Sequence, residues 1–150
     1  IISNKLMGMI NAYPIAISDT SGFTSLYISE FDIGSSHHMV DKELDHNLKE
    51  VDYKNKQGIF KSSLDELVQN WRFPMPNYLK IDVDGVEYEI LKGAKKTLST
   101  VTSIIVEWNK SHKNYKKMYQ YLTKLGFILF KEGEQENSYI NVVNAIFHRK

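Results

Sequence analysis

The amino-acid sequence predicts an α/β fold with a mostly parallel sheet and an antiparallel strand near its C-terminal end. In the second half of the chain, apolar runs of strand length alternate with segments of helical periodicity, which is typical of parallel strands joined by helical crossovers. The last two apolar runs have only a polar loop between them, so this pair should be antiparallel. Residues 1–150 fit one domain, with no linker that would divide it.

The composition excludes several classes of protein and of site. The 19 basic and 18 acidic side chains leave a net charge of +1, so neither a nucleic-acid-binding surface nor a polybasic membrane arm is indicated. The absence of cysteine excludes disulfides, thiolate metal sites and cysteine nucleophiles. No apolar run approaches the ~20 residues of a membrane-spanning helix, and no signal-peptide pattern opens the sequence. We therefore expect a cytoplasmic protein that neither binds nucleic acid nor spans a membrane.

The first half of the chain predicts three strands and a long irregular segment. Ala12–Ser18 is a short apolar run, a turn of sequence DTSG follows it, and Phe23–Ser29 alternates apolar and polar residues as a half-buried strand does. Glu30–Gln57 loses this pattern, and a loop of such length in a compact domain is usually functional or mobile. Gly58–Ser62 predicts a further short strand.

Helices and strands alternate in the next part of the chain. Ser63 and Glu66 have the spacing of a capping box and begin a helix whose apolar residues share one face. Tyr78–Val83 predicts a buried strand, and Val86–Leu98 predicts the helix that follows it. Ser103–Trp108 is rich in β-branched residues and predicts the next strand of the sheet.

The C-terminal part predicts one more helix and the closing strand pair. Tyr115–Leu125 has the periodicity of an amphipathic helix, and Gly126 is expected to end it as a left-handed residue. Phe127–Phe130 and Ile140–Phe147 predict the two antiparallel strands, joined by the polar stretch KEGEQENS.

The densest group of residues that could carry chemistry has the sequence KIDVDGVE, at residues 80–87. Asp82 lies at the carboxyl end of a predicted strand, where open α/β sheets place their ligand crevices. A carboxylate there could orient a cation, accept a substrate proton or bind a metal. Asp84 and Glu87 have a structural explanation, since they match a reciprocal capping box at the start of the following helix.

Three further residues are candidates for the same chemistry. Glu107 ends the next predicted strand, and adjacent parallel strands lie about 4.8 Å apart, so Glu107 and Asp82 should border one crevice. A solvated strand end is the alternative for Glu107. His37 and His38 lie in the long irregular segment, and the near-neutral pKa of histidine suits proton transfer or metal ligation, although two exposed loop histidines are the favoured interpretation. We expect His112 to be an ordinary surface residue.

Residues 78–94, with the sequence YLKIDVDGVEYEILKGA, resemble the signature of the FkbM-type S-adenosylmethionine-dependent methyltransferases, L-K-I-D-x-E-G-x-E-x-x-x-L-x-G-A. Ile104–Glu107 resembles the next strand of that family, and Ala16–Asp19 the end of its third strand. Ser63–Leu67 is similar to the helix before the signature. Asp84 stands where the family usually has Glu, which keeps the charge and shortens its reach. The family's Asp-x-Gly-x-Asn-x-Gly loop and its ribose-binding acid are not found in this sequence.

The resemblance implies a Rossmann-like class I methyltransferase sheet without its first two strands. It also implies an O-methyltransferase that uses S-adenosylmethionine to methylate a hydroxyl of a sugar, glycolipid or secondary metabolite. Removal of the first strand would expose the edge beside Tyr78–Val83, and such an edge invites pairing with another chain. We expect the Ala12–Ser29 strands or a second copy of the chain, in a homodimer, to cover it.

The resemblance also implies roles for individual residues. Ala16, Ser18 and Asp19 would lie near the adenine of the cofactor. Asp82 would face the methionine end and the reaction centre, where it would orient or deprotonate the acceptor hydroxyl. One of the two loop histidines is the second candidate for that role. No metal is implied.

Two alternatives stay open at the level of the sequence. The first is a truncated remnant or binding-only domain that folds and carries no activity. The second is a Mg²⁺-dependent phosphatase, because Asp-x-Asp-Gly after an apolar strand also resembles the nucleophile loop of haloacid-dehalogenase-like enzymes. That chemistry needs later acids to hold the metal, and no Asp follows Asp84 in this sequence.

Overall fold

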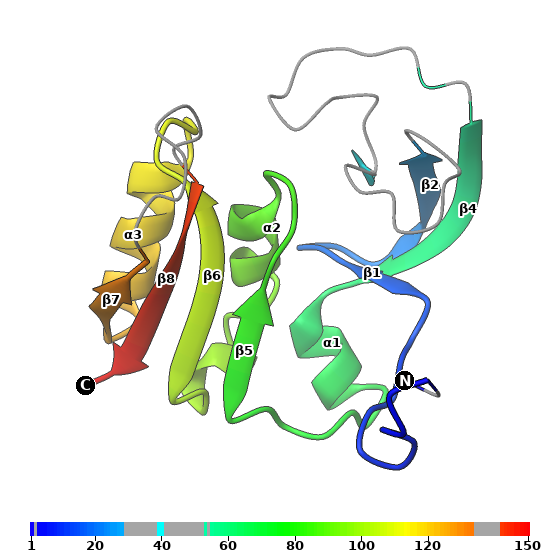
Figure 1. Cartoon of the computed structure of the whole chain (residues 1–150), viewed down its shortest axis with the longest axis horizontal. Helices are drawn as coiled ribbons and strands as arrows, with labels where there is room; N and C mark the ends of the chain where they lie inside the picture. Colours follow the sequence, from blue (N-terminus) through cyan, green and yellow to red (C-terminus); the bar gives the residue numbers. More distant parts are fainter. Residues whose placement is uncertain (2, 29–38, 41–52, 54, 134–141) are drawn as a thin grey trace.

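The structure is a computed structural model that describes residues 1, 3–28, 39–40, 53, 55–133 and 142–150. Within these residues, eight strands form two four-stranded sheets that lie side by side (Figure 1). Both sheets contain parallel and antiparallel pairs. The α/β class is therefore confirmed, whereas the expected mostly parallel sheet is wrong.

The first sheet has the strand order β1-β4-β2-β3. Its strands are β1 (Ile15–Ile17), β2 (Gly22–Ile28), β3 (Met39–Val40) and β4 (Asn55–Ser62). β1 runs parallel to β4, and β2 runs antiparallel to β4 and β3. The two strands predicted within Ala12–Ser29 are confirmed, but they do not pair with each other because β4 lies between them. β4 also begins three residues earlier than expected, inside the segment that the sequence predicts to be irregular.

The second sheet has the strand order β5-β6-β8-β7. Its strands are β5 (Tyr78–Ile81), β6 (Ser103–Asn109), β7 (Phe127–Glu132) and β8 (Val142–Arg149). β5 and β6 are parallel, and the predicted antiparallel pairing of the last two strands is confirmed. The last strand, β8, lies between β6 and β7 and is antiparallel to both. β6 and β7 run in the same direction, and β8 separates them with an antiparallel pairing on each side. The sheet therefore has one parallel pair and two antiparallel pairs, and it is not mostly parallel.

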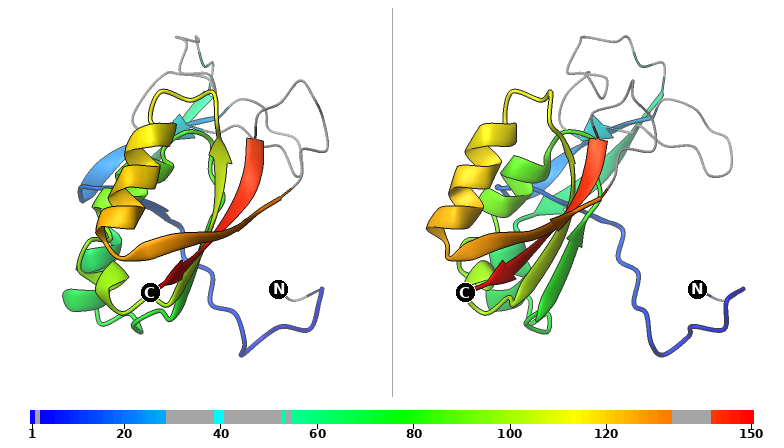
Figure 2. Two further views of the ribbon diagram at one scale, coloured as in Figure 1. Left: turned by 90° about the vertical axis from the view of Figure 1, so that its left-hand side faces the viewer. Right: turned by 60° about the vertical axis from the view of Figure 1, so that its left-hand side comes forward.

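The helices of the described chain are short. They are α1 (Leu64–Gln69), α2 (Glu87–Lys92), the 3₁₀ helix η1 (Thr97–Ser99) and α3 (Tyr115–Lys124). α2 and α3 cover the same face of the second sheet (Figure 2). None of the helices in these residues has the length and apolar character needed to cross a membrane.

The predicted helix boundaries are right where a local signal sets them. The Ser63 hydroxyl oxygen caps α1 by accepting from the backbone N–H of Glu66 at 3.1 Å, as the capping-box spacing predicts. Gly126, with φ of +88°, follows the end of α3 as expected. The capping box predicted for Asp84 and Glu87 is wrong, because α2 starts one residue after Val86 and has no side-chain cap.

The hydrophobic core belongs mainly to the second sheet and to the helices on it. β6, β7 and β8 contribute the side chains of Trp108, Phe127 and Phe147, each at most 1% exposed. α2 and α3 contribute Leu91 and Leu122, which are fully buried against them. The Trp108 and Phe147 rings meet edge to face with centroids 5.2 Å apart. The first sheet adds few buried apolar residues, so its position depends on the contacts that join it to the second.

Gly93, the residue after α2, is a point of close contact between the two halves. A Cβ added to Gly93 would overlap the carbonyl oxygen of Ser18 and lie 2.9 Å from the Cα of Asp19. Asp65 of α1 reinforces the joint: its N–H donates to the carbonyl oxygen of Gly93 at 3.0 Å. Its carboxylate accepts from the N–H and hydroxyl of Thr97 at 2.7 and 2.8 Å. The end of β1 and the start of α1 are thereby fixed against α2 and η1.

We predict that Gly93→Ala destabilises the fold by about 3 kcal/mol, because the added methyl group meets backbone that cannot rotate away. Thermal or denaturant unfolding measures the loss. Gly58→Ala in β4 is the matched control, since a Cβ at Gly58 meets nothing within 4 Å. Equal stability of the two variants would contradict a close contact at Gly93.

Candidate functional site

A pocket of about 850 Å³ lies between the end of β1 and the end of β5. One wall comes from β1 and the turn after it, residues 15–19, and the opposite wall from residues 79–86. α2 and the residues just before α3 close one end with Glu89, Lys113 and Asn114. The volume falls within the range of small-molecule sites. Four residues proposed from the sequence, Ala16, Ser18, Asp19 and Asp82, come together on its surface although more than sixty positions separate the first three from the last.

Asp82 directly follows β5 and remains accessible in the pocket wall. Its carboxylate pairs with the ammonium group of Lys80, and 46% of the Asp82 side chain is exposed. The same hydrogen bond raises the pKa of Lys80. Both side chains of the pair are largely exposed, so solvent screens the interaction and a ligand can displace Lys80 at small cost. The Asp82 carboxylate is therefore accessible to a molecule bound in the pocket.

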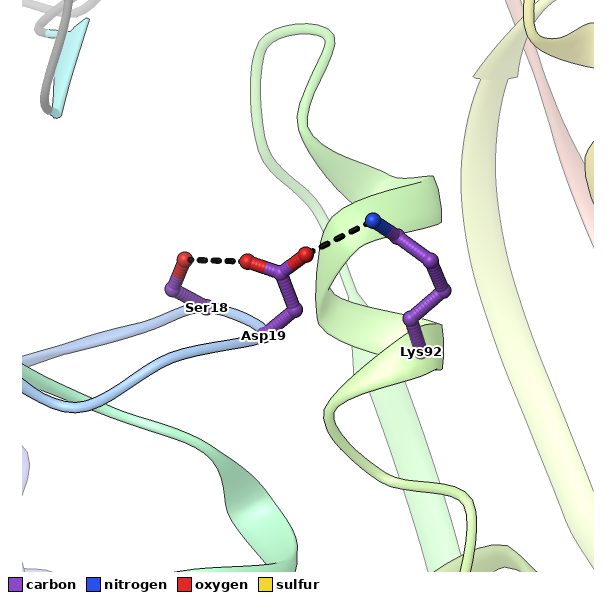
Figure 3. A network of polar contacts seen from close by, with 3 residues as sticks. All are labelled: Ser18, Asp19 and Lys92. Carbon is purple, nitrogen blue, oxygen red and sulfur yellow. Dashed lines mark hydrogen bonds and ion pairs between the residues drawn. The ribbon is translucent and has the colours of Figure 1, made fainter.

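Asp19 lies at the end of β1 and is tied to α2 (Figure 3). Its Oδ2 accepts from the Lys92 ammonium at 2.6 Å, and its Oδ1 accepts from the Ser18 hydroxyl at 3.4 Å. The hydrogen bond from Lys92 is the main reason that the pKa of Asp19 is lowered, and it raises the pKa of Lys92 in turn. Lys92 also lies over the Tyr88 ring, 5.6 Å from its centroid. The first wall of the pocket therefore presents a carboxylate that is held in place and ionised.

Glu107 of β6 lies near the acids that follow β5. Burial raises the pKa of Glu107, and the charges of Asp82 and Asp84 raise it further. Glu107 is not among the described residues that line the pocket, so the structure places it beside the acids of the pocket wall and not on the pocket surface. The other two catalytic candidates, His37 and His38, lie outside the described residues.

Glu87 is an acid whose environment the capping-box interpretation missed. Its side chain is buried, only 8% of the residue being exposed, and its Oε1 accepts from the N–H of Gly85 at 3.0 Å. Burial raises the pKa of Glu87 to about 7, and Asp84 and Glu107 act in the same direction. Glu87 shares a buried helix face with Ile90 and Leu91, three and four residues on, and this spacing is the signal that could have found it. The carboxyl group thus fixes the loop that carries Asp82 and Asp84.

His112 is not the ordinary surface residue that the sequence predicts. It lies between β6 and α3, it is half-buried, and its Nδ1 accepts from the N–H of Asn114 at 3.2 Å. Its Nε2 and the Oε2 of Glu89 are both closed off from solvent and have no hydrogen-bond partner. Sequence periodicity carries no signal for this pair, because the two residues come from different elements that meet only in the fold.

The edge of β5 that faces away from β6 has no strand partner among the residues that the structure describes. The expectation that the Ala12–Ser29 strands cover it is wrong, because both strands pair with β4 instead. Coverage by a second copy stays a prediction. Within the same described residues, no group of three acidic or histidine side chains is arranged to hold a metal ion.

We predict that Glu87→Gln abolishes part of the pH dependence of stability. The folded state keeps Glu87 protonated up to about pH 7, whereas the ordinary value is 4.5, so the free energy of unfolding falls as the pH rises between these values. Glutamine can still accept from Gly85 and carries no charge. At pH 8 the variant should therefore be more stable by up to about 3 kcal/mol, and at pH 4 unchanged. Urea unfolding at both pH values measures this, and an equal effect at both would contradict it.

Comparison with known proteins agrees with the signature at residues 78–94. The model of the Methyltransferase FkbM domain family matches residues 4–129. The hexuronic acid methyltransferase AglP of Haloferax volcanii is 49% identical to the chain over 43 residues, which make up 29% of this chain and 18% of that protein. The match thus spans less than a fifth of the curated relative. No solved structure matches the chain at a significant level. Since the family match extends over most of the sequence, this chain belongs to the FkbM methyltransferase family.

Proposed function

We propose that the protein transfers a methyl group from S-adenosylmethionine to a hydroxyl of a sugar, a glycolipid or a related small metabolite. The observation that carries the proposal is the pocket in which residues 16–19 meet the loop after β5. Both segments belong to the part of the chain that the family match covers. A sugar acceptor is favoured because the matched relative is named for a hexuronic acid.

The chemistry of the pocket walls fits the proposed cofactor. S-adenosylmethionine combines a flat, largely apolar adenine with a positively charged sulfonium and an ammonium group. The pocket offers apolar surface from Ile15, Ile17 and Leu79, and carboxylates from Asp82 and Asp84 on the opposite wall from Asp19. Apolar walls suit the adenine, and the acids suit the two positive groups. Ala16, Ser18 and Asp19 would then hold the adenosine end and Asp82 the methionine end.

Asp82 is the residue proposed to act on the acceptor. When bound, the cofactor supplies an electrophilic methyl group, and what the protein must add is the position of the oxygen that attacks it. The exposed Asp82 carboxylate can accept a hydrogen bond from the acceptor hydroxyl and take its proton once Lys80 is displaced. His37 and His38 remain second candidates for the same role.

A binding-only domain is the second candidate function. The outer edge of β5, which has no strand partner in the described part of the chain, and the exposed ion pair of Asp82 favour it, because an enzyme usually encloses its reacting groups. Calorimetric titration of the purified protein with S-adenosylmethionine separates the two. Micromolar binding favours the enzyme, and the absence of binding favours the remnant. Mg²⁺-dependent phosphatase activity lost in Asp82→Asn would favour the dehalogenase-like alternative instead.

We predict that Asp82→Asn lowers methyl transfer to a hexuronic acid glycoside by about 10²-fold or more, since a proton acceptor is lost. The affinity for S-adenosylmethionine, measured by calorimetry, should change much less. Glu132→Gln is the matched control, because it weakens another lysine–carboxylate ion pair, the half-buried pair of Lys110 with Glu132 at 2.5 Å, outside the pocket lining. Equal activities of the two variants would show that Asp82 takes no part in the reaction.

A further inference from the structure

Glu87 is a buried acid next to the wall of the pocket, and the methyl transfer proposed for Asp82 does not use it. Only 8% of the residue is exposed, and it is not among the described residues that line the pocket. The three residues before it, Asp84, Gly85 and Val86, do line the pocket. Burial of a carboxyl group costs free energy unless the group makes a compensating interaction. The interaction that Glu87 makes is with the pocket wall.

The hydrogen bond from Gly85 links Glu87 to this wall. Gly85 has a φ of +91°, a backbone conformation that residues with a side chain rarely adopt. Its N–H donates to Glu87 Oε1 at 3.0 Å and to the carbonyl oxygen of Val83 at 3.3 Å. One buried side chain therefore closes the turn from β5 into α2. Asp82 and Asp84 are the acids that this turn places on the pocket surface.

The charges that act on Glu87 come from other acids. Burial is the main reason that its pKa is raised to about 7, and Asp84 of the same turn and Glu107 of β6 raise it further. The N–H groups of Gly85 and of Glu87 itself act in the opposite direction, because they favour the ionised carboxylate. Glu87 therefore changes its protonation near neutral pH, in response to the charge of its neighbours.

The same group of acids extends to the pocket surface through Asp82. Burial raises the pKa of Glu107, Asp82 and Asp84 raise it further, and Lys80 lowers it. The ammonium group of Lys80 also pairs with Asp82. Like charges disfavour one another's ionisation, and a nearby positive charge has the opposite effect. A cation placed against Asp82 and Asp84 would therefore favour the ionised form of Glu87 as well.

We propose that Glu87 is the positioning residue of the turn after β5, and that it releases its proton to solvent when a cation binds against Asp82 and Asp84. Ionised Glu87 accepts a stronger, charge-assisted hydrogen bond from Gly85, but it also repels Asp84. A bound cation offsets this repulsion, so cation binding and ionisation of Glu87 favour each other. The inference rests on the proposed function, in which the sulfonium and ammonium groups of S-adenosylmethionine are the cations. Affinity for the cofactor should therefore increase as the pH rises through 7.

Calorimetry of the purified protein with S-adenosylmethionine, in two buffers of different ionisation enthalpy, measures the protons released on binding at pH 7. We expect a net release, and an affinity about tenfold higher at pH 8 than at pH 6, which corresponds to a decrease of about one unit in the pKa of Glu87. Glu87→Gln can still accept from Gly85 but cannot ionise. This variant should bind as the unmodified protein does at pH 6 and lose the extra release and the extra affinity at higher pH. Glu87→Ala also loses the acceptor and should bind about tenfold more weakly at pH 6.

The amide resonance of Gly85 gives a second measurement, which needs no ligand. It should titrate near pH 7 in the free protein, at lower pH with S-adenosylmethionine bound, and not at all in Glu87→Gln. Glu132→Gln changes another partly buried carboxyl group outside the pocket lining, and it should release as many protons as the unmodified protein. S-adenosylhomocysteine, which lacks the sulfonium charge, should release fewer.

The outcomes separate the inference from the proposed function. Equal proton release by Glu87→Gln and the unmodified protein would overturn the inference while cofactor binding stands. A Gly85 resonance that titrates in the same way in both proteins would also overturn it. Absence of S-adenosylmethionine binding would instead overturn the proposed function and the coupling together.

Discussion

The close approach of Gly93 to the backbone of Ser18 is the constraint on which the rest of the arrangement depends. The second sheet has its own core, whereas the first sheet contributes little to it. The missing side chain at Gly93 lets the end of β1 lie directly against the end of α2. Asp65 and the ion pair of Lys92 with Asp19 then hold the contact from both sides. This joint places the pocket wall of residues 15–19 against the second half of the fold.

Much of the local structure could be predicted from the sequence, and the order of the strands could not. The ends of α1 and α3 follow from Ser63 and Gly126, because capping depends on neighbours along the chain. The positions of β4 between β1 and β2, and of β8 between β6 and β7, depend on which edges meet in space. Hydrophobic periodicity contains no information on that choice. α2 is shorter than the predicted helix Val86–Leu98. It ends at Gly93, where the backbone of Ser18 and Asp19, far away in the sequence, lies against it.

The candidate site divides in a similar way. The resemblance to the family indicates Ser18, Asp19 and Asp82, and these three do lie around one pocket. The unsatisfied buried atoms of Glu89 and His112 could not be predicted from the sequence, since such atoms exist only after α2 and α3 have packed. The acids at residues 80–87 show why single motifs mislead. Their spacing matches a capping box, yet α2 has no side-chain cap, and the fold buries Glu87 and exposes Asp82 only five residues away.

The uneven distribution of the core has a consequence for how the protein responds to a ligand. Separate parts of a protein open with different free energies, and the part with few buried apolar contacts opens first. Here the seam between a well-packed half and a lightly packed half is also the wall of the pocket. A molecule bound across the seam contacts both halves only while they are docked. Its binding therefore stabilises the docked state relative to the opened one. The rate of amide hydrogen exchange in β1, β2 and β4 would then fall when the pocket is occupied, while the exchange rate in the interior of the second sheet would not change.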